Sequence, residues 1–409
     1  MCASRVCAVS ATTADAREVR RAIRATRVVF AANGALFATW ISRIPAVRDD
    51  LGADERGLGF ALLFTAVGSL LAMPLSGRLV SSFGSRRVIA VCVVACMTAY
   101  PALGIVPSLV WLAVVLLVVG AGVGVWDVAM NVSGHGVEAH AGRTLMPGFH
   151  ACWSLGTVAG AGLGALAARV GLGPAAHFAV ACVVVGTVTL FWLRALPDGR
   201  APHDPADAAG ERHLPEARRP VIRDVRLIGL GVMTFCAAWA EGSANDWLAL
   251  LLADERDASG AEAAVGFAVF SAAMTGARVA GNKVVASLGR VPTLRWGAAL
   301  SAVGVVLLLG VPTLAAAYLG ALLWGLGIAI AFPLAMTAAG ETPGQGPAAI
   351  AMVATIAYTG FLVGPPLIGT IAHITGLGSA LWLVVGLAAG VLALSGTARP
   401  ARDPAGVRG

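Results

Sequence analysis

Long apolar stretches alternate with short polar interruptions along most of the chain, and this pattern predicts membrane-spanning helices. A hydrocarbon core of about 30 Å needs roughly 20 helical residues to cross it. Twelve stretches are long enough, near residues 27–47, 57–80, 86–106, 108–133, 145–169, 174–196, 226–252, 263–288, 291–311, 312–338, 347–373 and 378–398. The chain is therefore expected to be an all-α integral membrane protein with twelve transmembrane helices.

The second half of the chain repeats a pattern of the first. A glycine triplet with spacings of seven and two residues occurs twice, 205 residues apart, as Gly164, Gly171 and Gly173 and again as Gly369, Gly376 and Gly378. The largest polar interruption, from Pro197 to Arg226, separates six predicted spans from six. A membrane chain with such a repeat is expected to form two pseudo-symmetric six-helix bundles with a pathway between them.

These boundaries give an expected domain organisation. It consists of a disordered cytoplasmic N-terminus over 1–24, an N-terminal six-helix bundle over 25–196, a flexible cytoplasmic linker over 197–225, a C-terminal six-helix bundle over 226–398 and a cytoplasmic tail over 399–409. No cleavable signal peptide is evident, because the first apolar run is too long for a signal core.

Composition excludes a soluble protein and sets the orientation. Apolar residues make up 58% of the chain and charged residues 12%. The net charge of +7 comes almost entirely from arginines at segment ends, with Lys283 the only lysine, so it indicates membrane topology rather than a nucleic-acid surface. With the N-terminus in the cytoplasm, 23 basic residues fall on the cytoplasmic side and five outside, which predicts that both termini are cytoplasmic.

No soluble active site is visible in the sequence. The seven cysteines show neither metal-ligand nor disulfide spacing, and there is no phosphate-cradling glycine loop with its lysine. We therefore expect no enzymatic activity, no metal and no cofactor.

A motif between the second and third predicted spans resembles a known family. It reads Gly77-Arg-Leu-Val-Ser-Ser-Phe-Gly84-Ser-Arg86-Arg87 and has a degenerate partner from Gly281 to Arg290. With twelve spans in two sixes and a basic central loop, it resembles the loop signature of the major facilitator superfamily. The resemblance implies that Gly77, Gly84, Arg86 and Arg87 form a conformational loop. Ser81 stands where relatives usually carry an aspartate, which leaves open the salt bridge made there.

Four shorter strings narrow the resemblance. They are Trp40 to Pro45, Asp127 to Asn131, Gly148 to His150, and Glu241 to Trp247. They resemble a bacterial group of mostly uncharacterised permeases that includes a membrane protein of rhizopine biosynthesis. This implies a multi-pass protein of the bacterial cytoplasmic membrane.

Two carboxylates inside predicted spans are candidates for proton coupling, because ionisable groups at membrane depth are costly and are usually functional. Glu241 lies midway along the seventh span and shares a helical face with Asn245. Asp127 shares a face with Asn131 in the fourth span. The alternatives are a hydrogen bond from Glu241 to a backbone group near Gly242, and a fixed structural ion pair for Asp127.

Arg43 and Asp246 are candidates for an outer gate. Subtracting the repeat offset places Asp246 at the depth of residue 41, close to Arg43 on the first span. We hypothesise an ion pair that closes the outer side and breaks on opening. The alternative is that both residues are ordinary interfacial charges.

Arg278 is the only basic residue left inside a span. It is expected to hold an anionic solute group or to neutralise Asp127 or Glu241, unless its side chain reaches toward Lys283 at the helix end. The full set of candidate substrate-cavity residues is Asn33, Trp126, Asn131, His150, Asn245, Arg278 and Tyr358. For His150 the alternative is that it caps an interfacial helix end.

Together these features predict a secondary active transporter of a small organic solute that works by alternating access, with proton-coupled symport through Glu241 and Asp127. One alternative is proton-driven efflux of a drug or metabolite. Another is a non-transporting sensor on the same scaffold. The expected partners are the solute, protons and the lipid bilayer, with no nucleic acid, and the protein is expected to be a monomer.

Overall fold

The computed structural model describes residues 2–141, 145–196, 223–342 and 346–399, and every regular element in these ranges is a helix. Twelve helical segments of this part are long and apolar enough to cross a membrane. The prediction of an all-α protein with twelve spans is therefore confirmed. The chain divides into two compact units, which are described separately below.

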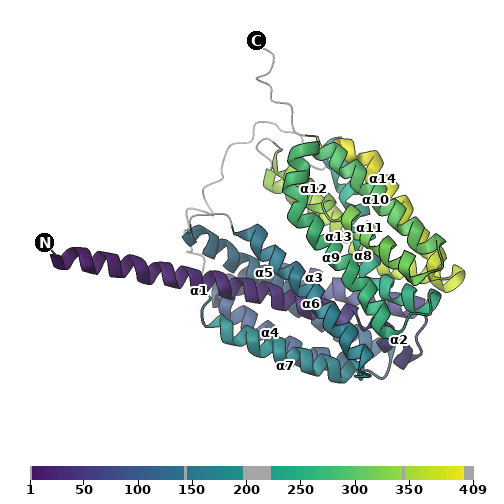
Figure 1. Ribbon diagram of the computed structural model, residues 1–409, viewed down its shortest axis with the longest axis horizontal. Coiled ribbons are helices and arrows are strands. Elements are labelled where there is room, and N and C mark those ends of the chain that lie inside the picture. The colour runs from purple at the N-terminus through teal and green to yellow at the C-terminus, as the bar shows by residue number, and fades with distance from the viewer. Residues whose placement is uncertain (1, 142–144, 197–222, 343–345, 400–409) are drawn as a thin grey trace, which may run out of the picture. The chain divides into compact units, whose positions relative to one another are not determined.

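Unit 1 comprises Met1–Gly52 and Phe64–Asp207. Figure 1 draws it from purple to teal as a bundle of helices. Its elements are α1 Cys2–Ile41, α2 Ile44–Leu51, α3 Glu55–Phe83, α4 Ser85–Leu103, α5 Leu109–Ala141, α6 Met146–Arg169 and α7 Pro174–Leu193. The first part of α3 has its contacts in unit 2, so α3 contributes to both units.

Unit 2 comprises Ala53–Leu63 and Ala208–Gly409. Figure 1 draws its helices in green to yellow. They are α8 Val225–Glu255, α9 Gly260–Leu288, α10 Arg290–Gly310, α11 Leu314–Ile328, α12 Ala331–Gly340, α13 Gly346–Thr375, α14 Leu377–Leu394 and the short 3₁₀ helix η2 Ser395–Ala398. Two helices, α11 and α12, stand where the sequence predicts one continuous tenth span.

The two units share one backbone plan, as the glycine repeat predicted. Six described residues have a positive φ, and they form three pairs that are each 205 residues apart: Gly52 and Asp257, Gly84 and Gly289, Gly171 and Gly376. The helix pairs in contact also correspond, since α1 packs on α6 as α8 packs on α13, and α4 packs on α7 as α10 packs on α14. The duplication therefore extends to the turns between the helices.

A row of glycines sets the distance between α1 and α6. A Cβ atom added at Gly156 would lie 2.0 Å from the Ala31 carbonyl oxygen, and one at Gly160 would lie 2.3 Å from that of Ala35. Contacts this short leave no room for a side chain, so the helices approach backbone to backbone. In unit 2, Gly360 on α13 likewise faces backbone, since a Cβ atom there would lie 2.8 Å from the Phe235 carbonyl oxygen of α8, whereas Gly364 makes room for the Trp239 ring.

The N-terminal segment differs from expectation. The sequence predicts disorder over residues 1–24, but α1 begins at Cys2 and extends as one long rod from unit 1 (Figure 1). Arginine and alanine, which are frequent here, are both strong helix formers and continue the helix of the first span outward. The expected linker over 197–225 lies outside the described residues up to 222, and the expected tail lies outside them from 400 onward.

The α1–α6 packing predicts the effect of a single methyl group. Gly160→Ala is expected to lower the free energy of unfolding by about 1–3 kcal/mol, because the new Cβ atom meets backbone that cannot rotate away. Gly162→Ala on the same helix is the matched control, since nothing lies within 4 Å of that position. Thermal unfolding in detergent measures both, and equal melting temperatures for the two variants would contradict the close approach.

Candidate functional site

An ion pair between neighbouring helices lies inside unit 2. Arg278 on α9 places Nη2 3.2 Å from each carboxylate oxygen of Glu241 on α8. The Glu241 side chain is 18% exposed and that of Arg278 is 29% exposed, so the pair is mostly buried but still accessible. Glu241 is one of the partners that the sequence left open for Arg278, and the structure pairs the two side chains within unit 2.

The second contact of Arg278 is made possible by a proline. In a continuous helix the N–H of residue 333 would bond to the carbonyl of residue 329, but Pro333 has no N–H. The helix is interrupted between α11 and α12, and Arg278 Nε donates to the Ala329 carbonyl oxygen at 3.3 Å. A guanidinium at the C-terminal end of α11 also complements the negative end of the helix dipole.

Aromatic rings adjoin the ion pair. Phe361 on α13 packs against the backbone of Gly242, because a Cβ atom placed there would lie 3.0 Å from the Phe361 ring. Tyr358 lies between two rings, with centroid distances of 6.2 Å to Phe332 and 6.3 Å to Phe361. Tyr358 is 41% exposed, so this aromatic group is reachable from outside the helix packing.

This arrangement combines groups of complementary chemistry. Arg278 is a fixed cation with five donors, Glu241 can carry a negative charge or a proton, and the rings offer apolar contact. Sequence reasoning identified Glu241, Arg278 and Tyr358 but missed the Ala329 carbonyl and the rings of Phe332 and Phe361. The signal for Ala329 was Pro333, four residues later, whose missing N–H frees that carbonyl.

In unit 1 the structure places Asp127 and Asn131 together on α5. The Asn131 amide donates to the Asp127 backbone oxygen at 2.8 Å and lies 3.4 Å from its carboxylate. Asp127 is partly exposed and makes no ion pair with a described residue of unit 1. The shared face inferred from the spacing is present, and the structural ion pair considered as its alternative is absent from this part of the chain.

Two of the predicted cavity residues in unit 1 are buried between helices. Asn33 is 2% exposed and accepts a hydrogen bond from Trp153 Nε1 at 2.9 Å across the α1–α6 contact. Trp126 is fully buried. In this structure both therefore support helix packing. His150 is exposed near the start of α6, and its ring lies edge-on to Phe30 at 5.3 Å.

The two predicted gate residues belong to different units, so their pairing stays a prediction. Arg43 is 5% exposed and donates from Nη2 to the Leu172 carbonyl oxygen at 2.7 Å, while its Nε and Nη1 atoms are buried and have no hydrogen-bond partner among the described residues. Asp246 on α8 is partly exposed and makes no ion pair with a described residue of unit 2. Asn245 beside it is also partly exposed.

The loop motif of unit 1 folds as a helix–turn–helix connection. Gly84, with φ of 81°, is the N-cap of α4, and Gly77 has open space around it. Arg86 and Arg87 follow in the first turn of α4, where Arg86 is partly exposed and Arg87 is exposed. The Ser81 hydroxyl donates to the Arg78 carbonyl of its own helix at 3.0 Å, so this position is satisfied locally.

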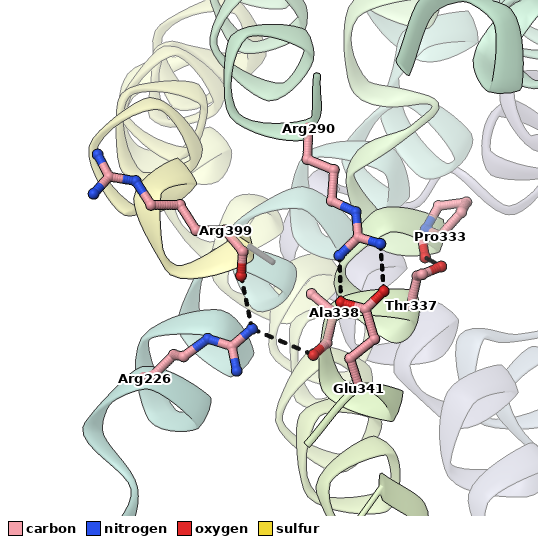
Figure 2. A network of polar contacts seen from close by, with 7 residues as sticks. All are labelled: Arg226, Arg290, Pro333, Thr337, Ala338, Glu341 and Arg399. Carbon is pink, nitrogen blue, oxygen red and sulfur yellow. Dashed lines mark hydrogen bonds and ion pairs between the residues drawn. The ribbon is translucent and has the colours of Figure 1, made fainter. Parts of the chain in front are cut away.

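The corresponding end of unit 2 carries a polar network, drawn in Figure 2. Arg290, directly after the turn at Gly289, binds both carboxylate oxygens of Glu341 at the end of α12. Arg226 at the start of α8 donates to the carbonyls of Thr397 at 3.1 Å and Arg399 at 2.9 Å. It therefore ties the start of α8 to the last described residues of the chain.

Comparison with known proteins identifies the family. Residues 28–348 and 230–408 match the Major Facilitator Superfamily. An uncharacterised MFS-type transporter of Yersinia pestis is 34% identical over 360 residues, which cover 88% of this chain and 91% of that protein. The chain belongs to the Major Facilitator Superfamily. Membrane protein MosC of Rhizobium meliloti is 28% identical over 365 residues, covering 89% of this chain and 86% of MosC, which confirms the predicted bacterial group.

Solved structures agree on the major facilitator fold. The nucleoside transporter NupG matches with a TM-score of 0.73 at 13% identity, covering 92% of this chain and 98% of NupG. A D-xylose–proton symporter matches with a TM-score of 0.70 at 17% identity, covering 92% of this chain and 97% of the symporter. At these identities the likeness shows the fold alone. The protein is thus an integral membrane protein of a transporter family.

The pair in Figure 2 makes the stability of unit 2 depend on pH. Hydrogen bonds from Arg290 lower the pKa of Glu341 below its usual value of 4.5. A carboxylate whose pKa is lowered on folding stabilises the folded state above pH 4.5. This stabilisation is lost as the pH falls through the pKa that the carboxylate has in the folded state. Glu341→Gln is expected to cost about 0.5 kcal/mol at pH 7, since the pair is partly exposed, and less at pH 3.

Thermal unfolding at both pH values measures this difference. Arg290→Gln serves as the second arm, because it removes the same pair from the other side and is expected to flatten the same pH dependence. A Glu341→Gln effect of equal size at pH 7 and pH 3 would contradict the role assigned to the pair.

Proposed function

We propose that the protein is a proton-coupled symporter of a small organic solute and that it works by alternating access. The observation that carries the proposal is the contact among Glu241, Arg278 and the Ala329 carbonyl at the interruption between α11 and α12. Interrupted helices supply the binding groups in many secondary transporters, because their free backbone ends meet ions and polar solutes.

Charge balance relates the proton to the solute. While Glu241 is ionised, it neutralises Arg278. When a proton binds to a carboxylate oxygen of Glu241, the attraction between the two side chains weakens and the guanidinium gains an uncompensated charge in surroundings of low dielectric constant. An anionic or strongly accepting group of the solute then replaces the carboxylate. Proton and solute are thereby favoured together, which is the condition for symport.

The aromatic group indicates what else the solute carries. Phe361 lies on Gly242 next to the ion pair, and Tyr358 joins Phe361 to Phe332. Such rings bind the apolar face of a small molecule while Arg278 binds its polar end. We therefore propose a solute with an anionic or carbonyl group on a compact organic frame. Asp127 in unit 1 remains a proposed second proton carrier.

We further propose that both termini lie in the cytoplasm of a bacterium. The support is the distribution of basic residues, 23 on the proposed cytoplasmic side and five on the other. This orientation puts the Arg290–Glu341 network on the cytoplasmic side, because α10 begins and α12 ends there. The proposed outer gate of Arg43 and Asp246 lies toward the opposite side.

Solute-dependent pH change in proteoliposomes tests the proposal. A panel of small organic acids, sugars and polyols is added to vesicles that contain the wild type and report internal pH. Symport predicts internal acidification with the transported solute. Glu241→Gln is expected to reduce this signal at least about tenfold, the effect of about 1.4 kcal/mol of lost coupling.

Glu255→Gln is the matched control on the same helix. Glu255 accepts a hydrogen bond from the Gly378 N–H, which the glutamine oxygen can also accept, so its proton signal is expected to stay at the wild-type level. Alkalinisation with solute would instead establish antiport. Solute flux without any pH change would contradict proton coupling, and no flux across the panel would favour a sensor.

A further inference from the structure

A recess in unit 1 is lined by four arginines and two aromatic rings. It has a volume of about 420 Å³, and its lining residues are Arg17, Arg20, Arg21, Arg24, Phe191, Trp192 and Ala195. The arginines come from α1 and the rings from the end of α7. Neither the loop motif nor the proposed solute site includes any of these residues.

The spacing of the arginines makes them one face of α1. Positions separated by three, four and seven residues lie within an arc of about 100° on a helix. All four side chains are exposed, whereas Ala22, Ile23 and Ala25 on the other faces are buried in the bundle. The arginine side chains therefore project from the face of α1 that does not pack against the bundle.

None of the carboxylates that the structure describes is paired with these arginines. None of the four arginines forms an ion pair with a described residue, and Glu18, the nearest acidic residue in sequence, does not line the recess. Four like charges on two helical turns repel one another. Bringing a multivalent anion to them is favourable, and guanidinium groups bind phosphate through paired N–H donors.

The aromatic residues distinguish a lipid from a soluble anion. Phe191 is 62% exposed and lies edge-on to Trp192, at a centroid distance of 6.1 Å. Both stand in the last turn of α7, at the end of an apolar span. Exposed rings at this depth are typical of the boundary between headgroups and acyl chains. The distance along α1 from Arg17 to Arg24 is about 10 Å, comparable to the thickness of a headgroup layer.

We propose that this recess binds the phosphate headgroup of an anionic phospholipid, with an acyl chain against Phe191 and Trp192. Four guanidinium groups in one recess match a headgroup with two phosphates, as in cardiolipin, better than a headgroup with one. The proposal rests on the cytoplasmic placement of α1 given above, where anionic lipid attracts basic segments. It does not depend on the solute or on proton coupling.

Native mass spectrometry of the full-length protein in detergent tests the proposal. Cardiolipin, phosphatidylglycerol and phosphatidylcholine are added separately, and the fraction of protein with bound lipid is measured at each concentration. The expected order of affinity is cardiolipin, then phosphatidylglycerol, then phosphatidylcholine. Arg20→Gln with Arg24→Gln is expected to weaken cardiolipin binding by at least about tenfold, since each surface arginine contributes about fivefold.

Two further arms make the result decisive. Arg56→Gln with Arg169→Gln removes the same charge from two exposed arginines outside the recess and is expected to bind cardiolipin like the wild type. Trp192→Ala is expected to weaken cardiolipin binding several-fold through lost acyl contact. Circular dichroism confirms that each variant is folded.

Equal binding of the three lipids, or equal losses for the two arginine pairs, would overturn the proposal. Displacement of cardiolipin by millimolar inorganic phosphate would also overturn it, because the site would then hold a soluble anion. These outcomes are independent of transport: a protein that moves solute and protons but shows no lipid preference would refute this site alone.

Discussion

A backbone carbonyl without its helical partner organises the centre of unit 2. Pro333 has no N–H to offer Ala329, and a bare carbonyl inside a membrane helix is costly unless another donor satisfies it. Arg278 provides that donor from α9. The arginine in turn requires a negative charge, which Glu241 supplies from α8. One missing hydrogen bond thus connects three helices through one charged side chain.

Arginines at helix ends recur in the molecule. Arg256 donates to the carbonyls of Leu308 and Leu309 at the end of α10, and Arg226 donates to those near the chain's last described helix. Such contacts satisfy carbonyls that a helix cannot satisfy itself and match the sign of its dipole. Arg278 differs from these because the helix end that it binds lies within a span. The proposed coupling site therefore includes the Arg278 contact, whereas the other contacts stabilise helix ends.

The fold was largely predictable because the membrane restricts it. Apolar length fixed the twelve spans, and the glycine repeat anticipated the paired turns at Gly84 and Gly289. The site was predictable only in part. Glu241 and Arg278 stood out as charges within spans, but their pairing depends on three-dimensional contact between α8 and α9. The burial of Trp126 and Asn33 against neighbouring helices could not be inferred from the sequence. A polar or aromatic residue in a span gives the same sequence pattern whether it faces a cavity or another helix.

Separating exchange from accumulation tests whether the Glu241–Arg278 pair couples the proton to the solute. In proteoliposomes of Glu241→Gln combined with Arg278→Gln, which leaves no unpaired charge, labelled solute is followed in two modes: exchange against internal unlabelled solute, and uptake driven by a pH gradient. In this double variant the pH gradient is expected not to drive accumulation, even where exchange persists. Gradient-driven accumulation at the wild-type level would contradict the assignment of the Glu241–Arg278 pair as the coupling site.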